Sequence, residues 1–245
     1  GSPEEASLDG HAAFKKQSVP SATADYAKIY SRLDDSAERL FHFDDNLDDS
    51  SGNGSNGSIG GGTPTYAVST AGGTRNNATF GKAIFFDGND YATFPDPGIG
   101  QGDFTVEWFV NFQNNPNSGL SYIWGYAGTT HGSGLLQLYR YNDVWYFLVW
   151  DHTLGTPAYS APMFFTDSLT TNTWYHVAIV REGTNLSFYR DGTRRVHLIN
   201  HPVPYIIGGG DTWSIGRIGT ISAHYADDVY IDEFCLSKEA KYSNN

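Results

Sequence analysis

The chain has 245 residues, of which 27 are acidic and 15 are basic, so its formal net charge is −12. A surface this acidic repels phosphate backbones, and we therefore expect no nucleic-acid partner. The single cysteine excludes an internal disulfide and a cysteine-based zinc site. No apolar run approaches the ~18 residues that could span a membrane, so we expect no membrane insertion.

Residues 1–36 differ in composition from the rest of the chain. They are polar, with one small apolar cluster around Tyr26 and Ile29. Such a segment cannot bury a core of its own. We expect an N-terminal arm at residues 1–36 that packs on the main domain or on a neighbouring subunit, and a single domain at residues 37–245.

Strand-like segments separated by turn residues follow from Leu40 onward. After "RLFHFDD" comes a loop rich in Gly, Ser and Asn at residues 46–64. "KAIFFDG" and "DYATFPD" meet at an Asp-Gly turn signal, which predicts a tight hairpin over residues 82–95. "DFTVEWFVNF" alternates, with Val106 and Trp108 on one face and Glu107 and Phe109 on the other.

The second half of the chain continues the same pattern. "GLLQLYRYNDVWYFLVWD" predicts two strands joined at Asn142-Asp143, and residues 173–196 predict three strands with turns at Glu182-Gly183 and Asp191-Gly192. His176 and Cys235 alternate with core positions, so we expect both to be buried and unreactive. No segment favours a long helix. The fold class is therefore all-β, an antiparallel β-sandwich of the jelly-roll kind.

The last strand is "VYIDEF". Strict alternation assigns its side chains to two faces. One face carries Tyr230, Asp232, Phe234 and Leu236, and the other carries Ile231, Glu233 and Cys235.

Five segments taken together resemble the concanavalin A-like lectin/glucanase superfamily. They are "KAIFFDGNDYATFPD", "GDFTVEWFVNF", "TNTWYHVAIVREGTNLSFYRDGT", "WSIGRIG" and "YIDEFCLSKEAKYS". Within that superfamily they are most similar to the laminin-G-like group, and the loop "DDSSGNG" fits the same group. The resemblance runs from Leu40 to Tyr242 and is more specific for the fold than for the function. It implies that the last strand, "VYIDEF", pairs with the first strand, "LFHF", and so closes a sheet.

A second resemblance concerns the N-terminal segment. "QSVPSATADYAKIYSRLDDSAERLFHFDDN" is similar to segments of phage tail fibres that precede a receptor-binding domain. It implies a homotrimeric, extracellular virion appendage that recognises a host surface polysaccharide. Two alternatives stay open: a structural or oligomerisation domain of an appendage or capsid, and a carbohydrate-binding module of a bacterial secreted protein.

Glucanases of this superfamily place carboxylates at alternate positions of one strand, where they act as acid and nucleophile. The nearest candidate here is Asp228, Tyr230 and Asp232, in which tyrosine fills the central position. We therefore expect no enzyme and no catalytic residue.

No cofactor is required, but many members of this superfamily hold a structural calcium ion. Carboxylate and carbonyl oxygens on turns suit such a hard cation. The candidate ligands are Asp49, Asp87, Asp90 and Asp232, and the alternative is that these aspartates only cap turns.

Sugar binding needs exposed aromatic faces and hydrogen-bonding groups. Residues 114–161 form the least family-like stretch, and variable loops on a rigid scaffold often carry binding sites. The candidates are Trp124, Tyr126, His131, Tyr139, Tyr141, Trp145, Trp150, Asp151 and His152. The alternative for each ring is a place in the core or in a contact between subunits.

Overall fold

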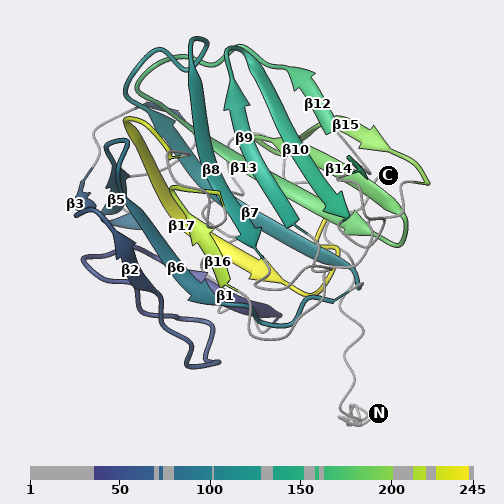
Figure 1. Cartoon of the computed structure of the whole chain (residues 1–245), viewed down its shortest axis with the longest axis horizontal. Coiled ribbons are helices and arrows are strands. Elements are labelled where there is room, and N and C mark those ends of the chain that lie inside the picture. The colour runs from purple at the N-terminus through teal and green to yellow at the C-terminus, as the bar shows by residue number, and fades with distance from the viewer. Residues whose placement is uncertain are drawn as a thin grey trace, which may run out of the picture.

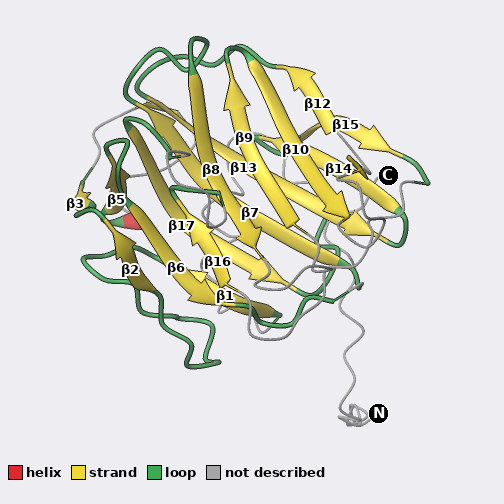
Figure 2. Ribbon diagram, in the orientation of Figure 1, coloured by secondary structure: helices red, strands yellow, loops and turns green. Residues whose placement is uncertain are grey.

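A computed structural model describes residues 36–68, 72–73, 80–100, 102–127, 135–151, 158–159, 163–200, 212–218 and 225–242. These residues form seventeen β-strands in two sheets (Figure 1), and strands make up nearly all of the regular structure (Figure 2). This confirms the all-β, antiparallel sandwich. No helix in the described part of the chain is long and apolar enough to cross a membrane. Of the predicted arm, residues 1–36, only Ser36 lies within the described residues.

One sheet has nine strands. Along the sheet, in spatial order, lie β15 (Thr193–Leu198), β14 (Asn185–Arg190), β13 (Thr173–Glu182), β7 (Phe104–Phe112), β17 (Val229–Ser237), β5 (Ala83–Phe86) and β3 (Thr65–Ala67). In addition, β1 (Ala37–Phe41) pairs with β17, and β4 (Gly72–Gly73) pairs with β13. The pairing of β1 with β17 confirms that the last strand closes the sheet against the first.

The other sheet has eight strands and faces the viewer in Figure 1. Its order is β11 (Ala158–Tyr159), β10 (Val144–Asp151), β9 (Leu135–Tyr141), β8 (Leu120–Ala127), β16 (Thr212–Ile215), β6 (Tyr91–Pro95) and β2 (Ser58–Gly61), with β12 (Met163–Thr166) also paired to β10. Large aromatic side chains fill the space between the two sheets. Trp108 of β7, for example, packs edge-on against Trp124 of β8 with ring centres 5.9 Å apart.

The predicted hairpins of the second half are present. Asn142 has a φ of 52° at the turn between β9 and β10, where Tyr141 pairs with Val144. Asp191 and Gly192 both have positive φ values between β14 and β15, as a two-residue hairpin turn requires.

The hairpin predicted over residues 82–95 is wrong. β5 pairs with β17 and β3 in the nine-stranded sheet, whereas β6 pairs with β16 and β2 in the eight-stranded sheet. The turn between them carries the chain from one sheet to the other. The Asp90 carboxylate stabilises this turn by accepting the backbone N–H groups of Thr63 and Asp87 at 2.5 and 3.3 Å.

The face assignment of the last strand is also partly wrong, because β17 contains a β-bulge. Its register with β7 shifts between Asp232 and Cys235, and Glu233 has a φ of 48°. One extra residue reverses the alternation beyond it. Ile231 therefore shares the core with Phe234 and Leu236, while Cys235 packs on the other side against Ala37 and Leu40.

Candidate functional site

Three of the aromatic side chains predicted to bind sugar lie in the core. Trp124, Tyr126 and Trp145 are each at most 1% exposed. Trp124 contacts Trp213 of the neighbouring strand as well as Trp108 of the opposite sheet. A ring enclosed in this way presents no face to a ligand in solvent, so this part of the prediction is wrong.

A second β-bulge explains why Trp124 points inward. The register of β8 with β9 shifts between Tyr122 and Trp124, which makes Ile123 an extra residue. Regular alternation would place Tyr122 and Trp124 on the same face. With the extra residue, Trp124 turns into the core and Tyr122 stays on the outer face of the sheet.

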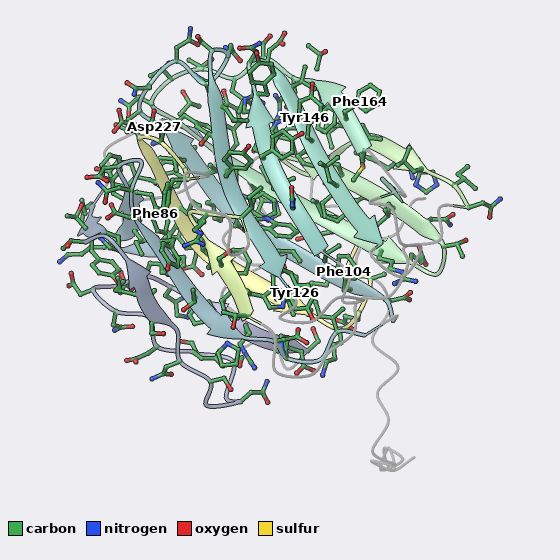
Figure 3. The ribbon with its side chains drawn as sticks, in the orientation of Figure 1. Phe86, Phe104, Tyr126, Tyr146, Phe164 and Asp227 are labelled. Carbon is green, nitrogen blue, oxygen red and sulfur yellow. The ribbon has the colours of Figure 1, made fainter. Side chains whose placement is uncertain are left out.

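That outer face carries a line of aromatic side chains, which we call the aromatic row: Tyr122, Tyr139, Tyr146 and Phe164. The rings of Tyr122 and Tyr139 lie 5.3 Å apart, and those of Tyr139 and Tyr146 lie 4.9 Å apart and nearly parallel, at 6°. Tyr146 and Phe164 follow at 6.4 Å. Figure 3 shows Tyr146 and Phe164 on the side that faces the viewer, near β10 and β12. The row crosses four adjacent strands, so it runs across the strands and not along them.

Strand register builds the row. Tyr139 is the direct cross-strand partner of both Tyr122 and Tyr146, and Tyr146 is the partner of Phe164. Directly opposed side chains on one face of a sheet lie close enough to stack. Neighbouring strands are about 4.8 Å apart, so the row extends about 15 Å over three strand spacings.

Exposed apolar side chains continue this surface on one side. Phe164 is 62% exposed, and the cross-strand partners Leu120 and Tyr141 are 43% and 49% exposed. Tyr139 and Tyr141 are thus the two predicted sugar-binding residues that the structure places on an accessible face. Exposed aromatic side chains gathered in this way are typical of a binding surface.

The remaining predicted residues are not placed. His131 and His152 lie outside the described residues. Trp150 and Asp151 belong to β10, but their side chains lie outside the described part of the structure as well. Their roles stay predictions.

Tyr122, Tyr146 and Phe164 were missed from the sequence. For Tyr146 a signal was present, because it alternates with Trp145 and must face outward if Trp145 is core. Tyr122 gave no such signal, since its orientation depends on the bulge at Ile123. Phe164 became part of the site only through its pairing with Tyr146.

A small hollow lies beside the aromatic row, at the end of the sandwich. Its volume is about 60 Å³, and Leu120, Ser121, Arg140 and Asp227 are among the residues that line it. This volume suits a few water molecules and not a sugar ring. The candidate site is therefore an open face and not a pocket.

Two carboxylates on the strands of the nine-stranded sheet are buried. Asp232, from the candidate triplet, is fully buried. Glu107 is buried too, and it accepts hydrogen bonds from Lys241 at 2.8 Å and His176 at 3.2 Å. Burial alone would raise the pKa of Glu107, but these two neighbours outweigh it and hold the pKa well below its usual value. A general acid needs the opposite shift. His176 and Cys235 are each 2% exposed, which confirms their predicted burial.

The four predicted calcium ligands do not come together in the described structure. Asp49 accepts backbone N–H groups from Leu40, Ser51 and Ser55, at 3.0, 3.0 and 3.3 Å. Asp90 caps the turn between the sheets. Among the described residues, no group of three His, Cys, Asp or Glu side chains could hold a metal ion. Calcium binding therefore stays a prediction without a geometric site.

Known structures share this architecture. The chain matches the binding domain of Paraclostridial Mosquitocidal Protein 1 with a TM-score of 0.62 and 15% identity, covering 85% of this chain and 50% of the other. It matches the binding domain of botulinum neurotoxin DC in complex with SialylT with a TM-score of 0.58 and 13% identity, covering 85% and 49%. This chain therefore spans about half the length of those two domains.

A third similar structure is matched over most of its own length. It is domain 4 of AbnA, a GH43 extracellular arabinanase from Geobacillus stearothermophilus, in complex with arabinotriose. The TM-score is 0.53 at 17% identity, and the match covers 82% of this chain and 94% of that one. Identities this low show a shared fold and nothing beyond it.

Sequence comparison is more specific than the structural likeness. A comparison with curated proteins gives no match. The model of one family, described as the concanavalin A-like lectin/glucanases superfamily, matches residues 86–241. That match includes β7, β13 and β17, which form the middle of the nine-stranded sheet, as well as all four strands of the aromatic row. The chain belongs to the concanavalin A-like lectin/glucanases superfamily.

Proposed function

We propose that this chain binds carbohydrate on the outer face of its eight-stranded sheet. The observation that carries the proposal is the aromatic row, which is partly accessible along its length and most exposed at Phe164. Sugar rings present C–H groups on their faces, and these groups stack on aromatic rings while the hydroxyl groups stay hydrated or hydrogen-bonded. A row of this kind suits an extended oligosaccharide that lies across the strands.

The tyrosine hydroxyl groups add hydrogen bonding to the stacking surface. Tyr122, Tyr139 and Tyr146 each carry a hydroxyl group that can donate and accept hydrogen bonds. Burial raises the pKa of Tyr122, so its hydroxyl group keeps its proton at neutral pH and remains a donor. An open face of this composition supports shallow, reversible binding and not turnover.

Two of the similar structures support a carbohydrate ligand, although at the level of fold only. The arabinanase domain was solved with arabinotriose and the neurotoxin binding domain with SialylT. The same neurotoxin DC binding domain was also solved in complex with rat synaptotagmin II, so a domain with a similar fold also binds a protein. The aromatic row of the present chain, and not the likeness, favours a sugar.

The finer proposal is that the protein is the receptor-binding tip of a phage tail fibre and recognises a host surface glycan. Its support is the similarity of the N-terminal segment to tail-fibre segments. A homotrimer would present several aromatic rows on one virion, so weak single-site affinity would still give firm attachment. The protein would act outside the host cell, without catalysis.

Titration with oligosaccharides tests the proposal directly. A glycan array that includes host polysaccharides, followed by calorimetric titration of any hit, should show saturable binding. Replacing Phe164 with alanine should weaken this binding about tenfold, because one stacking contact is lost. Ile199→Ala is the matched control, since Ile199 is 64% exposed and lies just beyond β15, in the other sheet.

Three outcomes would contradict the proposal. They are a lack of binding across the array, equal binding by the Phe164→Ala variant, and release of reducing sugar by the wild-type protein. The last outcome would show an enzyme and not a binding domain.

A further inference from the structure

A cation packs against two tyrosine rings on the outer face of the eight-stranded sheet, where Tyr91 alternates with the core residue Ala92. The Arg217 guanidinium carbon lies 4.4 Å from the centre of the Tyr91 ring and 5.8 Å from that of Tyr225. The two tyrosine rings are themselves 6.1 Å apart. Stacking of this kind holds a guanidinium in a fixed orientation.

The backbone of β2, at the edge of the sheet, packs directly against the Tyr91 ring. A Cβ atom added at Gly60 would lie 2.1 Å from the Tyr91 ring, and one added at Gly61 would lie 2.6 Å from it. Only glycine therefore lets this strand pass so close to the ring. The position of Tyr91, and through it that of Arg217, depends on this close approach.

Arg217 is not neutralised by a carboxylate within the described part of the chain. Two other arginines, in contrast, share an acidic partner: Arg190 and Arg195 both contact Asp167, at 2.5 and 3.0 Å. No described carboxylate forms an ion pair with Arg217, and its Nε atom is buried without a hydrogen-bond partner there. The charge of Arg217 is therefore left for an acceptor from outside this part of the chain.

The acidic residue nearest to Tyr225 along the chain faces elsewhere. Asp227 follows Tyr225 by two positions, and its Oδ1 atom lies 3.0 Å from the place where a Cβ atom of Gly88 would be. Asp227 thus borders the turn between β5 and β6. Burial and the neighbouring Asp228 and Asp87 raise its pKa, which is the shift expected for a carboxyl group without a cation beside it.

Arg217 continues the aromatic row beyond Tyr122. The backbone N–H of Tyr122 donates to the carbonyl oxygen of Tyr225 at 3.2 Å, and Tyr225 forms an isolated bridge with Arg217. β16, which Arg217 follows, lies between β8 and β6. The line across the sheet therefore runs from Phe164 through the three tyrosines to Arg217 and Tyr91. It covers about five strand spacings, or about 24 Å.

We propose that Arg217, which packs against Tyr91 and Tyr225, is a subsite for the carboxylate of an acidic sugar, so that the glycan bound along the aromatic row is an acidic polysaccharide. This inference rests on the proposed function. The guanidinium fork matches the two oxygens of a carboxylate, and the flanking rings can stack on the sugar that carries it. The net charge of −12 does not prevent this contact, because charges beyond about 8 Å are largely screened at physiological ionic strength.

The test uses paired ligands that differ only in charge. Oligosaccharides of uronic acids and of sialic acid are titrated next to the same oligosaccharides with each carboxyl group reduced to an alcohol. The wild-type protein should bind at least one acidic form about tenfold more tightly than its reduced partner, as expected for one charge-assisted contact. In Arg217→Gln the ratio of the two affinities should fall to about one.

The matched control is Arg194→Gln, which removes the same charge from an exposed position of β15 in the other sheet. It should keep the acidic preference of the wild-type protein. A melting curve for each variant shows whether the fold is retained. Tyr225→Leu should lower the preference as well, because it removes one of the two rings that hold Arg217.

The outcomes separate this inference from the proposed function. Binding of neutral glycans without any preference for the acidic forms overturns the inference and leaves the proposed function standing. An acidic preference that survives in Arg217→Gln also overturns it. A lack of binding to every acidic and neutral glycan overturns both.

Discussion

The outer faces of the two sheets differ in whether another part of the chain covers them. On the nine-stranded sheet, Glu107 and His176 point away from the core, and the end of the chain folds over them. Lys241 binds Glu107 at 2.8 Å, and the Tyr242 hydroxyl group donates to the same carboxylate. Tyr242 also packs on Tyr189, with ring centres 5.5 Å apart. On the eight-stranded sheet, the aromatic row keeps part of its surface accessible, most of all at Phe164.

If the proposed function holds, this difference separates the face that stabilises the fold from the face that binds. Where residues 238–242 cover the nine-stranded sheet, Lys241, His176 and Tyr242 all bond the Glu107 carboxylate, and the pKa of Glu107 is held low. Where aromatic rings stay accessible, they remain available for a ligand. A side chain on an outer face is thus structural or functional according to whether the chain covers it.

The largest expected effect is a loss of stability, and it comes from a substitution on the covered outer face of the nine-stranded sheet. Glu107→Ala leaves Lys241 and His176 without their shared carboxylate, and removal of one partner of a buried ion pair typically costs about 3 kcal/mol. Urea denaturation should show this loss in the free energy of unfolding. Glu239→Ala, an exposed acidic position on the same terminal segment, should change it by less than about 0.5 kcal/mol. Equal stability of the two variants would mean that the contacts of Glu107 with the segment around Lys241 do not stabilise this face.

A smaller effect on stability is expected from a substitution in the aromatic row, on the open face of the eight-stranded sheet. Tyr139→Ala removes the ring that stacks on both Tyr122 and Tyr146, so glycan affinity should fall about tenfold or more. Because Tyr139 is partly exposed, the free energy of unfolding should fall by only about 1 kcal/mol. Calorimetric titration and urea denaturation of the same preparation measure both quantities. A large loss of stability with unchanged affinity would reverse the roles that we assign to the two faces.

The nine-stranded sheet also contains a contact whose contribution to stability depends on pH, between Glu233 and His42. Glu233 of β17 bonds His42 at 2.9 Å, but the His42 side chain is 37% exposed. The hydrogen bond to Glu233 raises the pKa of His42 above its ordinary value of 6.5. Its contribution to stability is therefore complete below about pH 6.5 and is lost as the pH rises through the folded-state pKa. Solvent screening limits it to about 0.5 kcal/mol.

Urea midpoints measured between pH 5.5 and 8.5 at small intervals, ~0.5 unit apart, resolve this step. The wild-type protein should lose the increment over that range, and His42→Gln should not. A step of the same size in both proteins would assign the titration to another group.

Calcium removal should have the smallest effect. Asp49 and Asp90 use their carboxylate oxygens to accept backbone N–H groups, so they stabilise turns without a cation. The melting temperature should be the same with and without a chelator, whereas Asp49→Ala should cost about 1 kcal/mol. A clear fall in melting temperature on chelation would instead support a structural calcium ion.

Much of the fold was predictable from local patterns. Turn pairs such as Asn142-Asp143 and Asp191-Gly192 determine their hairpins through residues adjacent in the chain. Alternation in β7 correctly separated Trp108, which faces the core, from Glu107, which does not. The partnership of the first and last strands followed from the family resemblance, since no local pattern specifies which distant strands pair.

The candidate site was less predictable, because its decisive features depend on strand pairing. Alternation assumes that each residue opposes one residue of the neighbouring strand, and the bulge at Ile123 breaks that rule. The bulge sends Trp124 into the core and leaves Tyr122 outside. The bulge at Glu233 likewise reverses the alternation that we expected for the residues after it in the last strand.

The sequence by itself determined the all-β class, the hairpins of the second half, the acidic surface and the family, because each of these follows from composition, local turns or motifs. Only the tertiary structure decided which aromatic rings are core and which form the row, and that Arg217 lies at its end. The physical reason is that cross-strand register brings together residues from four separate strands, and that a face stays open only where no other part of the chain packs on it.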